Sequence, residues 1–270
     1  MIKNNYKDKV AIITGGAGAL GYAMAKGLAN EGVKVALLGR TEHTVTAKVN
    51  EIKSIGGQAM GIIGDVLKSS DLETAKNQVL QNWGKINILI NAAGGNVKGA
   101  TIMPDDSFFD MDITAFDTVT DLNLKGTVLP SLIFGKEIAK QPTGSIINIS
   151  SIAASQVLTR VVGYSAAKAA VENFTKWLAV EMARKLSTNI RVNAIAPGFF
   201  IGKQNEALLM NPDGTLTDRG KTIIANTPMK RFGEAEELVS TVLWLCSDTS
   251  SFINGIVVHV DGGFSAFSGV

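Results

Sequence analysis

The sequence has little cysteine and little histidine, and each scarcity excludes a class of protein. The single cysteine, Cys246, cannot form a disulfide within the chain and suits a reducing compartment. The two histidines, His43 and His259, are far apart in sequence and have no cysteine cluster beside them. We therefore expect neither a disulfide scaffold nor a metal site.

Long apolar runs and a strong charge are also missing. No stretch of 18 or more apolar residues occurs, and the polar start, Met1–Lys9, has no apolar signal core. The formal net charge is only +2 over 270 residues, and no segment concentrates lysine and arginine. We expect a cytoplasmic protein that binds a small molecule, without affinity for membranes or nucleic acid.

Seven short runs rich in β-branched residues recur along the chain, each followed by a helical pattern. They are continuously apolar, as strands buried on both faces of a parallel sheet are. No linker or internal repeat divides them. The sequence predicts an α/β fold of the Rossmann type: a doubly wound, seven-stranded parallel sheet with helices on both faces, forming a single domain over residues 1–270. The runs are Val10–Ile13, Val33–Leu38, Met60–Ile63, Ile86–Ile90, Ile146–Ile149, Ile190–Ile195 and Ile256–Val260.

One long irregular region, about residues 199–232, interrupts this alternation after a strand. It contains a turn signal, Asn211–Gly214, and precedes the last helix. Long loops in compact domains are usually functional, and ligands of open α/β sheets bind outside the carboxyl ends of the strands. We expect this region to be a substrate lid.

A glycine-rich turn, Thr14–Gly21, follows the first strand and opens into a helix with Leu20, Met24 and Leu28 on one face. A pyrophosphate needs backbone N–H groups at a helix N-terminus with no side chains in the way. The strand before and the helix after favour a dinucleotide site over a merely flexible loop. The glycines that supply the space are Gly15, Gly16, Gly18 and Gly21.

The end of the second strand bears on the choice between NAD and NADP. A carboxylate there would bond the ribose 2′-OH and repel a 2′-phosphate. Gly39 and Arg40 stand in its place, so a cation is available for the phosphate. We expect NADP to be preferred, with NAD as the alternative if Arg40 is only a solvated side chain at a strand end.

Tyr164 and Lys168 are spaced four residues apart at the start of a helix, which puts both side chains on one face. A phenol titrates near ~10, and an adjacent ammonium can lower that pKa by roughly 1–3 units. Tyr164 could then exchange a proton with a carbonyl oxygen. Ser151, at a strand end, could polarise the same carbonyl or simply cap a helix; its neighbour Ser150 should face the other way.

These motifs together resemble the short-chain dehydrogenase/reductase family in order and spacing, over nearly the whole chain. The resemblance implies that Tyr164 is the general acid/base, Ser151 polarises the carbonyl, and Lys168 also holds the nicotinamide ribose. It implies that Asn123 holds a water that relays protons to Lys168. The matching segments are Thr14–Gly21, Asn91–Gly94, Asn123, Ser151, Tyr164, Lys168, Pro197, Gly198 and Val260–Gly263.

The resemblance also implies a cofactor site. Asp65 and Val66 resemble the adenine-binding pair, Asn91 with Gly94 supports the cofactor beside the central strand, and Pro197–Gly198 approaches the carboxamide. The family is usually tetrameric, so we expect a homotetramer. The full cofactor set is Gly15, Gly18, Leu20, Gly21, Arg40, Asp65, Val66, Asn91, Gly94, Tyr164, Lys168, Pro197 and Gly198.

Two positions depart from the family pattern. Ala19 stands where the turn usually has its middle glycine, so we expect a shifted phosphate contact. Gly202 stands where a threonine often follows the Pro-Gly pair, which puts the carboxamide contact and the ordering of the loop in question.

The lid suggests the substrate. It carries five basic and three acidic side chains, and a cationic lid could recognise a carboxylate, although a solvated surface is the plain alternative. Residues that could contact a sugar acid are Asn96, Arg160, Lys203, Gln204 and Asn205.

Three segments around and after the lid resemble the D-mannonate oxidoreductases (fructuronate reductases) of this family, which interconvert D-fructuronate and D-mannonate. They are Pro197–Asn205, Thr227–Gly233 and Asp261–Gly269. Gluconate 5-dehydrogenase and 3-oxoacyl-[acyl-carrier-protein] reductase activities remain alternatives. A cofactor-binding regulator without chemistry is a further one, but a pure binder has no need of the Ser151, Tyr164 and Lys168 set.

Overall fold

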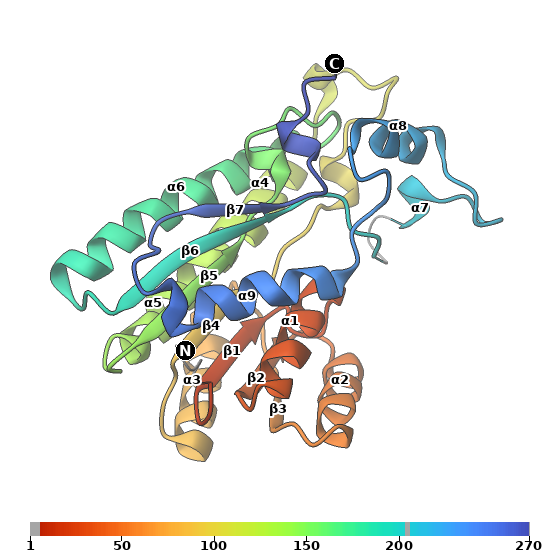
Figure 1. Ribbon diagram of the computed structural model, residues 1–270. Helices are drawn as coiled ribbons and strands as arrows, with labels where there is room; N and C mark the ends of the chain where they lie inside the picture. The colour runs from red at the N-terminus through yellow and green to blue at the C-terminus, as the bar shows by residue number, and fades with distance from the viewer. Residues whose placement is uncertain (1–5, 203–205, 270) are drawn as a thin grey trace.

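The computed structural model describes residues 6–202 and 206–269, and one parallel sheet organises them. Its seven strands are arranged in the order β3-β2-β1-β4-β5-β6-β7 (Figure 1). Each predicted apolar run overlaps one strand, so the Rossmann-type fold and the single seven-stranded sheet are confirmed. The strands are β1 (Val10–Thr14), β2 (Lys34–Gly39), β3 (Ala59–Ile63), β4 (Ile88–Asn91), β5 (Gly144–Ile149), β6 (Ile190–Pro197) and β7 (Val257–Val260).

Helices cover both faces of the sheet. Side chains of α1, α2 and α9 pack in one apolar cluster, and side chains of α3, α5 and α6 pack in the other. The helices are α1 (Ala19–Asn30), α2 (Glu42–Ser54), α3 (Ser69–Trp83), α4 (Ile113–Thr120), α5 (Gly126–Ile138), α6 (Val162–Lys185), α7 (Glu206–Leu209), α8 (Asp218–Asn226) and α9 (Val239–Cys246).

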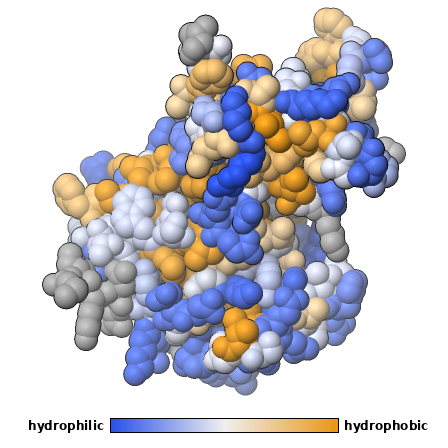
Figure 2. All heavy atoms as spheres, turned by 45° about the vertical axis from the view of Figure 1, so that its right-hand side comes forward, coloured by the Kyte–Doolittle hydropathy of each residue, from blue (hydrophilic) through white to orange (hydrophobic). Residues whose placement is uncertain are grey.

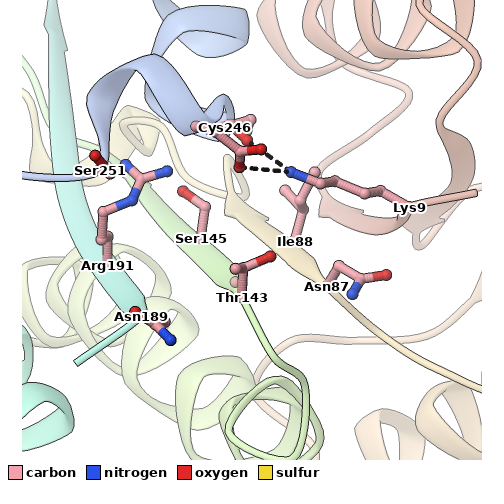
Figure 3. Close-up of a pocket in the computed structure, with 11 residues that line it drawn as sticks. Lys9, Asn87, Ile88, Thr143, Ser145, Asn189, Arg191, Cys246 and Ser251 are labelled. Atoms are coloured by element: carbon pink, nitrogen blue, oxygen red, sulfur yellow. Dashed lines mark hydrogen bonds and ion pairs between the residues drawn. The ribbon is translucent and has the colours of Figure 1, made fainter. Parts of the chain in front are cut away.

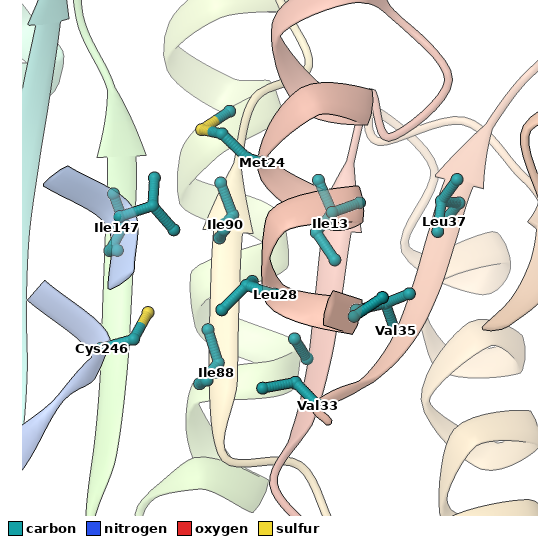
Figure 4. Packing of buried hydrophobic residues seen from close by; sticks show 14 of the residues in the cluster. Ile13, Met24, Leu28, Val33, Val35, Leu37, Ile88, Ile90, Ile147 and Cys246 are labelled. Carbon is teal, nitrogen blue, oxygen red and sulfur yellow. The ribbon is translucent and has the colours of Figure 1, made fainter. Parts of the chain in front are cut away.

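The continuous apolar runs are explained by this double cover. Successive residues of a strand point to opposite faces, so Ile12 and Ile13 of β1 enter different clusters, and both are fully buried. On one face, Met24 and Leu28 of α1 lie against Ile90 and other strand residues (Figure 4). A strand with only one covered face would have shown alternation instead.

The strand order reverses between β1 and β4, and this topological switch places the candidate site. β1 pairs with β2 on one side and with β4 on the other, so Thr14 is in register with Asn91 at the carboxyl edge. Asn91 is in turn in register with Asn148 of β5. The glycine-rich turn and the loops after β4 and β5 therefore open at one edge, where ligands of such sheets bind.

The lid is more regular than the sequence indicated. Residues 199–232 contain α7 and α8, and a bridge between Met210 and Leu216 closes the turn between them. Thr217 caps α8 by accepting a hydrogen bond from the Gly220 N–H. The expectation of an irregular segment is wrong here, because short capped helices leave only a weak periodic signal.

Within the described residues, no helix is both long enough and apolar enough to cross a membrane. The same residues contain no group of three or more histidine, cysteine or acidic side chains positioned to hold a metal ion.

Candidate active site

The glycine-rich turn is shaped by close approaches to its neighbours. Gly15 has a φ of +62°, and a Cβ there would lie 2.8 Å from the carbonyl oxygen of Ala92. Gly18 precedes α1 and supplies no side-chain cap, while a Cβ on Gly18 would meet only the Gly15 oxygen, at 3.2 Å. The first N–H groups of α1 therefore lack a helical partner and face an uncrowded side. This donor set fits a pyrophosphate.

The two departures from the family pattern lie against each other. A Cβ built on Gly202 would be 3.9 Å from the Cβ of Ala19, which is ordinary van der Waals contact. The methyl group gained at residue 19 thus faces the place where a threonine side chain would stand at residue 202. Relative to the family pattern, the turn therefore gains a methyl group, and the start of the lid beside it loses a threonine side chain.

The expected adenosine end lies at the carboxyl ends of β2 and β3. Arg40 is exposed immediately after β2, and a Cβ on Gly39 would come within 4.0 Å of Ala17 in the turn. Asp65 accepts a hydrogen bond from the Leu67 N–H at 3.0 Å, and Val66 is buried. The structure therefore places Gly39 beside the glycine-rich turn, and Asp65 and Val66 just after β3, at the same carboxyl edge of the sheet.

Lys168 is a buried cation, with only 4% of its surface exposed. Its Nζ donates to the Ile149 carbonyl oxygen at 2.7 Å and lies 5.6 Å from the centre of the Tyr164 ring. Burial lowers the pKa of Lys168 to about 8, and no acidic group offsets that burial. Two of the three ammonium protons have no partner among the described residues, so the side chain can still hold another group.

The direction of the Tyr164 pKa differs from the sequence prediction. The phenol is half-buried on the first turn of α6, and burial raises its pKa above the ordinary value, opposed by hydrogen bonding to Ser151. The predicted lowering by the Lys168 ammonium is wrong in this structure, because desolvation outweighs the charge of a lysine that points at a backbone carbonyl. Tyr164 is therefore a phenol that keeps its proton at neutral pH.

The opposite directions of Ser150 and Ser151 stay a prediction, since both side chains have partners on α6. Ser150 Oγ donates to Glu172 on α6 at 2.8 Å. Ser151 Oγ caps the short 3-10 helix Ile152–Ala154 by accepting from the Ala153 N–H at 3.2 Å. Because that cap uses only an oxygen lone pair, the Ser151 hydroxyl hydrogen can also donate. The capping and carbonyl-polarising interpretations are thus compatible.

Asn123 fastens the loop that follows β4. It lies in a π-helical turn, Asp121–Lys125, and its Oδ1 accepts from the Gly95 N–H at 3.0 Å. Its Nδ2 donates to the Gly95 and Val119 carbonyl oxygens at 2.8 and 2.7 Å. Both amide hydrogens of the side chain are therefore used within the protein, and a water could bond to the remaining lone pair of Asn123 Oδ1 or to the Asn123 backbone carbonyl, which accepts from Thr127.

Gly94 lies between the candidate catalytic side chains. A Cβ there would lie 2.6 Å from Asn123 Oδ1 and 3.3 Å from Lys168 Nζ. Any larger residue would push the buried ammonium or the Asn123 amide out of place. The glycine that the sequence suggested as a cofactor contact therefore also preserves the packing of this corner.

A buried polar network below the site was not predicted. Asn91 Nδ2 donates to Ser131 Oγ at 3.0 Å and to Asn148 Oδ1 at 2.8 Å. Asn148 donates onward to Thr175 on α6 at 2.9 Å. Asn91 was expected to support the cofactor, but its amide nitrogen is used within the protein. The available signal was an asparagine at or next to the end of two apolar runs, Asn91 after Ile86–Ile90 and Asn148 within Ile146–Ile149.

The carboxyl end of β6 leads directly into the lid. The Gly198 N–H donates to the Val260 carbonyl oxygen at 2.9 Å, and a Cβ on Gly198 would lie 2.7 Å from the Cα of Asp261. Pro197 and Gly198 thus lie at the same edge as Ser151, where the chain passes from β6 to the lid.

The expected substrate residues are only partly described. Asn96 is exposed and donates to Thr101 at 2.7 Å. Arg160 is half-buried and has a φ of +79°, with its carbonyl oxygen accepting from the Ile102 N–H at 3.0 Å. The other three fall outside the described residues: Lys203, Gln204 and Asn205.

The surface of the molecule is divided between its two halves. Figure 2 shows apolar side chains gathered in the upper half, where the lid and the C-terminal segment lie, and a mostly hydrophilic lower part. Ile201, Leu208, Met229 and Phe267 contribute exposed apolar surface there. The candidate site is therefore bordered by apolar as well as cationic groups.

A small cavity of about 60 Å³ lies at the opposite, amino-terminal edge of the sheet (Figure 3). Lys9 and Arg191 enter it from different elements, and Lys9 pairs with Asp248 at 3.7 Å. None of the candidate catalytic residues lines this cavity, so it is not part of the site.

Comparison with known proteins decides the family. Residues 15–265 match the family model described as Enoyl-(Acyl carrier protein) reductase. The chain belongs to the short-chain dehydrogenase/reductase family. An uncharacterised oxidoreductase of Bacillus subtilis (strain 168), UxuB, is 49% identical over 278 residues, covering 100% of this chain and 99% of that protein. The chain is thus an oxidoreductase of this short-chain dehydrogenase/reductase family, as predicted.

Two solved structures of the family are similar throughout. A proposed D-mannonate oxidoreductase from Haemophilus influenza with bound NAD is 43% identical, with a TM-score of 0.91 and coverage of 98% of this chain and 97% of that chain. A proposed NAD(P)-dependent gluconate 5-dehydrogenase from Beutenbergia cavernae with bound NADP is 28% identical, with a TM-score of 0.84 and coverage of 97% and 98%.

Proposed function

We propose that the protein interconverts a ketone and a secondary alcohol on a sugar acid, with D-fructuronate and D-mannonate as the pair. The observation that carries the chemistry is a protonated, half-buried Tyr164 beside the buried Lys168 cation and the Ser151 hydroxyl. The similarity to the Haemophilus influenza protein supports the choice of sugar acid. The excess of basic side chains on the lid supports a substrate with a carboxylate.

Each of the three side chains has a distinct task. Ser151 donates a hydrogen bond to the carbonyl oxygen, and Tyr164 gives that oxygen its proton during reduction or removes it during oxidation. Lys168 holds positive charge beside the phenol and stabilises the phenolate that remains after proton transfer. A water on the Asn123 carbonyl would return a proton through Lys168. A nicotinamide dinucleotide, when bound, supplies or accepts the hydride.

The residues that would hold the dinucleotide run along the carboxyl edge. Gly15, Gly18, Leu20 and Gly21 at the start of α1 would take the pyrophosphate, and Asp65 with Val66 would border the adenine. The nicotinamide half would lie beside the remaining candidates: Asn91, Gly94, Tyr164, Lys168, Pro197 and Gly198.

We propose that NADP is preferred, because Arg40 is exposed where a 2′-phosphate would lie. Arg40→Ala should lower kcat/KM for NADPH about 10- to 100-fold and leave kcat/KM for NADH within about twofold. Steady-state kinetics with both cofactors checks this. A wild-type enzyme that favours NADH more than tenfold, as the NAD-bound relative allows, would remove Arg40 from this role.

A cofactor-oxidation screen tests the substrate class. Hexuronates, keto-gluconates, 3-oxoacyl thioesters and neutral ketoses are each offered with NADPH and NADH. We expect the highest kcat/KM with D-fructuronate. The best activity on a keto-gluconate or on a 3-oxoacyl thioester would select one of those alternatives instead. Tight NADPH binding with no turnover on the whole panel would favour a cofactor-binding regulator.

We further propose that the chain is one domain whose lid, residues 199–232, covers the site, and that it assembles as a homotetramer. Apolar side chains on neighbouring helices support an assembly face: Leu132 on α5 is 58% exposed, and Trp177 on α6 is equally so. Native mass spectrometry should find four chains, and a stable monomer would contradict the assembly.

A further inference from the structure

The lid meets the loop before α6 through two arginines. Arg219 on α8 donates through Nη1 to the Thr159 hydroxyl at 3.3 Å, and Arg160 is the next residue of that loop. Burial lowers the pKa of Arg219, and the positive charge of Arg160 lowers it further. The Arg219 guanidinium thus contacts the loop that carries Arg160 and lies within range of its positive charge, at a cost to the folded chain.

No carboxylate among the described residues offsets this repulsion. The ion pairs formed by these residues include neither Arg160 nor Arg219. Asp218, the acidic neighbour of Arg219 in sequence, pairs with Lys221 at 3.1 Å instead. By contrast, Arg231 near the end of the lid forms a bidentate pair with Glu237 at 2.6 and 2.7 Å.

The backbone of Arg160 is also unusual. Its backbone φ of +79° is a value that residues other than glycine rarely adopt. The hydrogen bond from the Ile102 N–H to the Arg160 carbonyl oxygen holds that conformation. Strained residues of this kind cluster at ligand sites, where the surrounding structure over-determines them. Arg160 lies in the loop that leads into α6, four residues before Tyr164.

We propose that the guanidinium groups of Arg160 and Arg219 together bind the carboxylate of the substrate while its ketone lies at Ser151 and Tyr164. This inference rests on the proposed function and makes the two arginines the specificity-determining residues for a sugar acid. A carboxylate removes the repulsion between the two cations, and its planar oxygens match the guanidinium fork. The substrate class is a polyhydroxy ketone with a free carboxylate, and neither a neutral ketose nor an acyl thioester satisfies both arginines.

Substrate kinetics of matched variants test the two arginines. Arg160→Gln and Arg219→Gln should each raise KM for D-fructuronate about 10- to 100-fold while kcat changes less than about threefold. kcat/KM for D-fructose, which has no carboxylate, should change less than about twofold. Lys221→Gln, a change of an exposed cation on the same helix, is the control and should leave all these constants within about twofold.

Thermal unfolding separates binding from a structural role. Arg160→Gly relieves both the positive φ and the repulsion of Arg219, so its Tm should equal or exceed that of the wild type although KM for D-fructuronate rises. Calorimetric titration with D-mannonate should show the same loss of affinity in the Gln variants without turnover. A lower Tm with an unchanged affinity would make Arg160 a structural residue and overturn the proposal.

The outcomes distinguish the two levels of inference. A wild-type enzyme that turns over D-fructuronate, with Gln variants that keep its KM, would overturn the arginine site and leave the proposed function standing. A wild-type preference for a 3-oxoacyl thioester or a neutral ketose would overturn both. A preference for a phosphorylated ketose that is lost in the Gln variants would assign the arginines to phosphate and overturn the carboxylate.

Discussion

The buried residues beneath the site, which we call its floor, differ from the lid (residues 199–232) in how their polar side chains are paired. On the floor, Asn91, Asn123 and Asn148 are buried and bonded to neighbouring elements. On the lid, Arg219 reaches a neighbouring loop but has no counter-ion among the described residues. Buried hydrogen-bonded networks hold their side chains in one arrangement, whereas a cation on the surface without a counter-ion remains available to a ligand.

This difference separates two functions. The floor holds the phenol, the serine and the lysine in one geometry, which serves any carbonyl compound. In our proposal, the lid and the loop before α6 supply the charges that select one class of carbonyl compound. If chemistry and specificity reside in these different segments, changes in the floor should affect kcat and changes in the lid should affect KM.

Lys168 is the exception on the floor. It is buried as the polar network is, but its charge has no acidic partner and its pKa falls to about 8. A buried ammonium of this kind destabilises the folded chain, and active sites are where such groups are retained. The floor therefore contains one group whose burial costs stability, which fits the role in proton transfer that we propose for it.

The largest effect should follow removal of the proton donor on the floor. Tyr164→Phe should lower kcat about 10³-fold, because no other phenol can reach the carbonyl, and the Kd of NADPH should stay within about threefold. Stopped-flow reduction and NADPH fluorescence measure the two quantities. Tyr22→Phe, a change of a phenol that bonds Glu51 on the surface, is the control. A Tyr164→Phe enzyme that kept more than a tenth of the wild-type kcat would contradict the role of Tyr164 as proton donor, and with it the assignment of the chemistry to the floor.

A second prediction concerns Lys168 and pH. Its pKa of about 8 in the folded chain lies below the unfolded value of ~10.4, so the ammonium destabilises the fold fully below about pH 8. That penalty is relieved as the pH rises from about 8 towards ~10.4, where only the unfolded chain still holds the proton. Lys168→Met should therefore gain stability over the wild type at pH 7 and lose that gain by pH 10.

Denaturant unfolding at several pH values measures this difference. Lys176→Met, on the exposed side of the same helix, is the matched control and should show no such dependence. In carbonyl reduction, Lys168→Met should also lower kcat by about 10²-fold or more. An advantage over the wild type that stayed constant between pH 7 and pH 10 would contradict a buried, unpaired ammonium.

The smallest effect should come from the contact between turn and lid. Gly202→Thr should raise KM for NADPH about two- to fivefold, because the added γ atoms crowd the Ala19 methyl group. Ala19→Gly should give a similar small loss, and the double variant should recover most of it, since contacting residues couple. A double-mutant cycle of KM values measures the coupling. Independent, multiplicative effects would mean that the two departures from the family pattern are unrelated.

Much of the fold and part of the site followed from local patterns. The seven apolar runs predicted the strands because strands buried on both faces need apolar side chains at every position. The spacing of Tyr164 and Lys168 predicted their proximity because a helix brings every fourth residue to one face.

The features that the sequence did not predict depend on residues that lie far apart in the chain. The Asn91–Asn148–Thr175 network joins two strands and a helix, so no segment carries its signal alone. The Tyr164 pKa was predicted in the wrong direction because burial depends on everything packed around the phenol. The opposition of Ala19 and Gly202 became visible only when the lid was seen beside the turn.

The sequence by itself determined the order of strands and helices, the dinucleotide turn and the chemical identity of the reacting side chains. These depend on periodicity and on short spacings, which the chain carries locally. Only the tertiary structure decided how strongly each group is desolvated, which hydrogen bonds occupy it, and that Arg219 reaches the loop that carries Arg160. Desolvation and charge interaction depend on distance in space, and residues 59 positions apart in the chain can be neighbours only after folding.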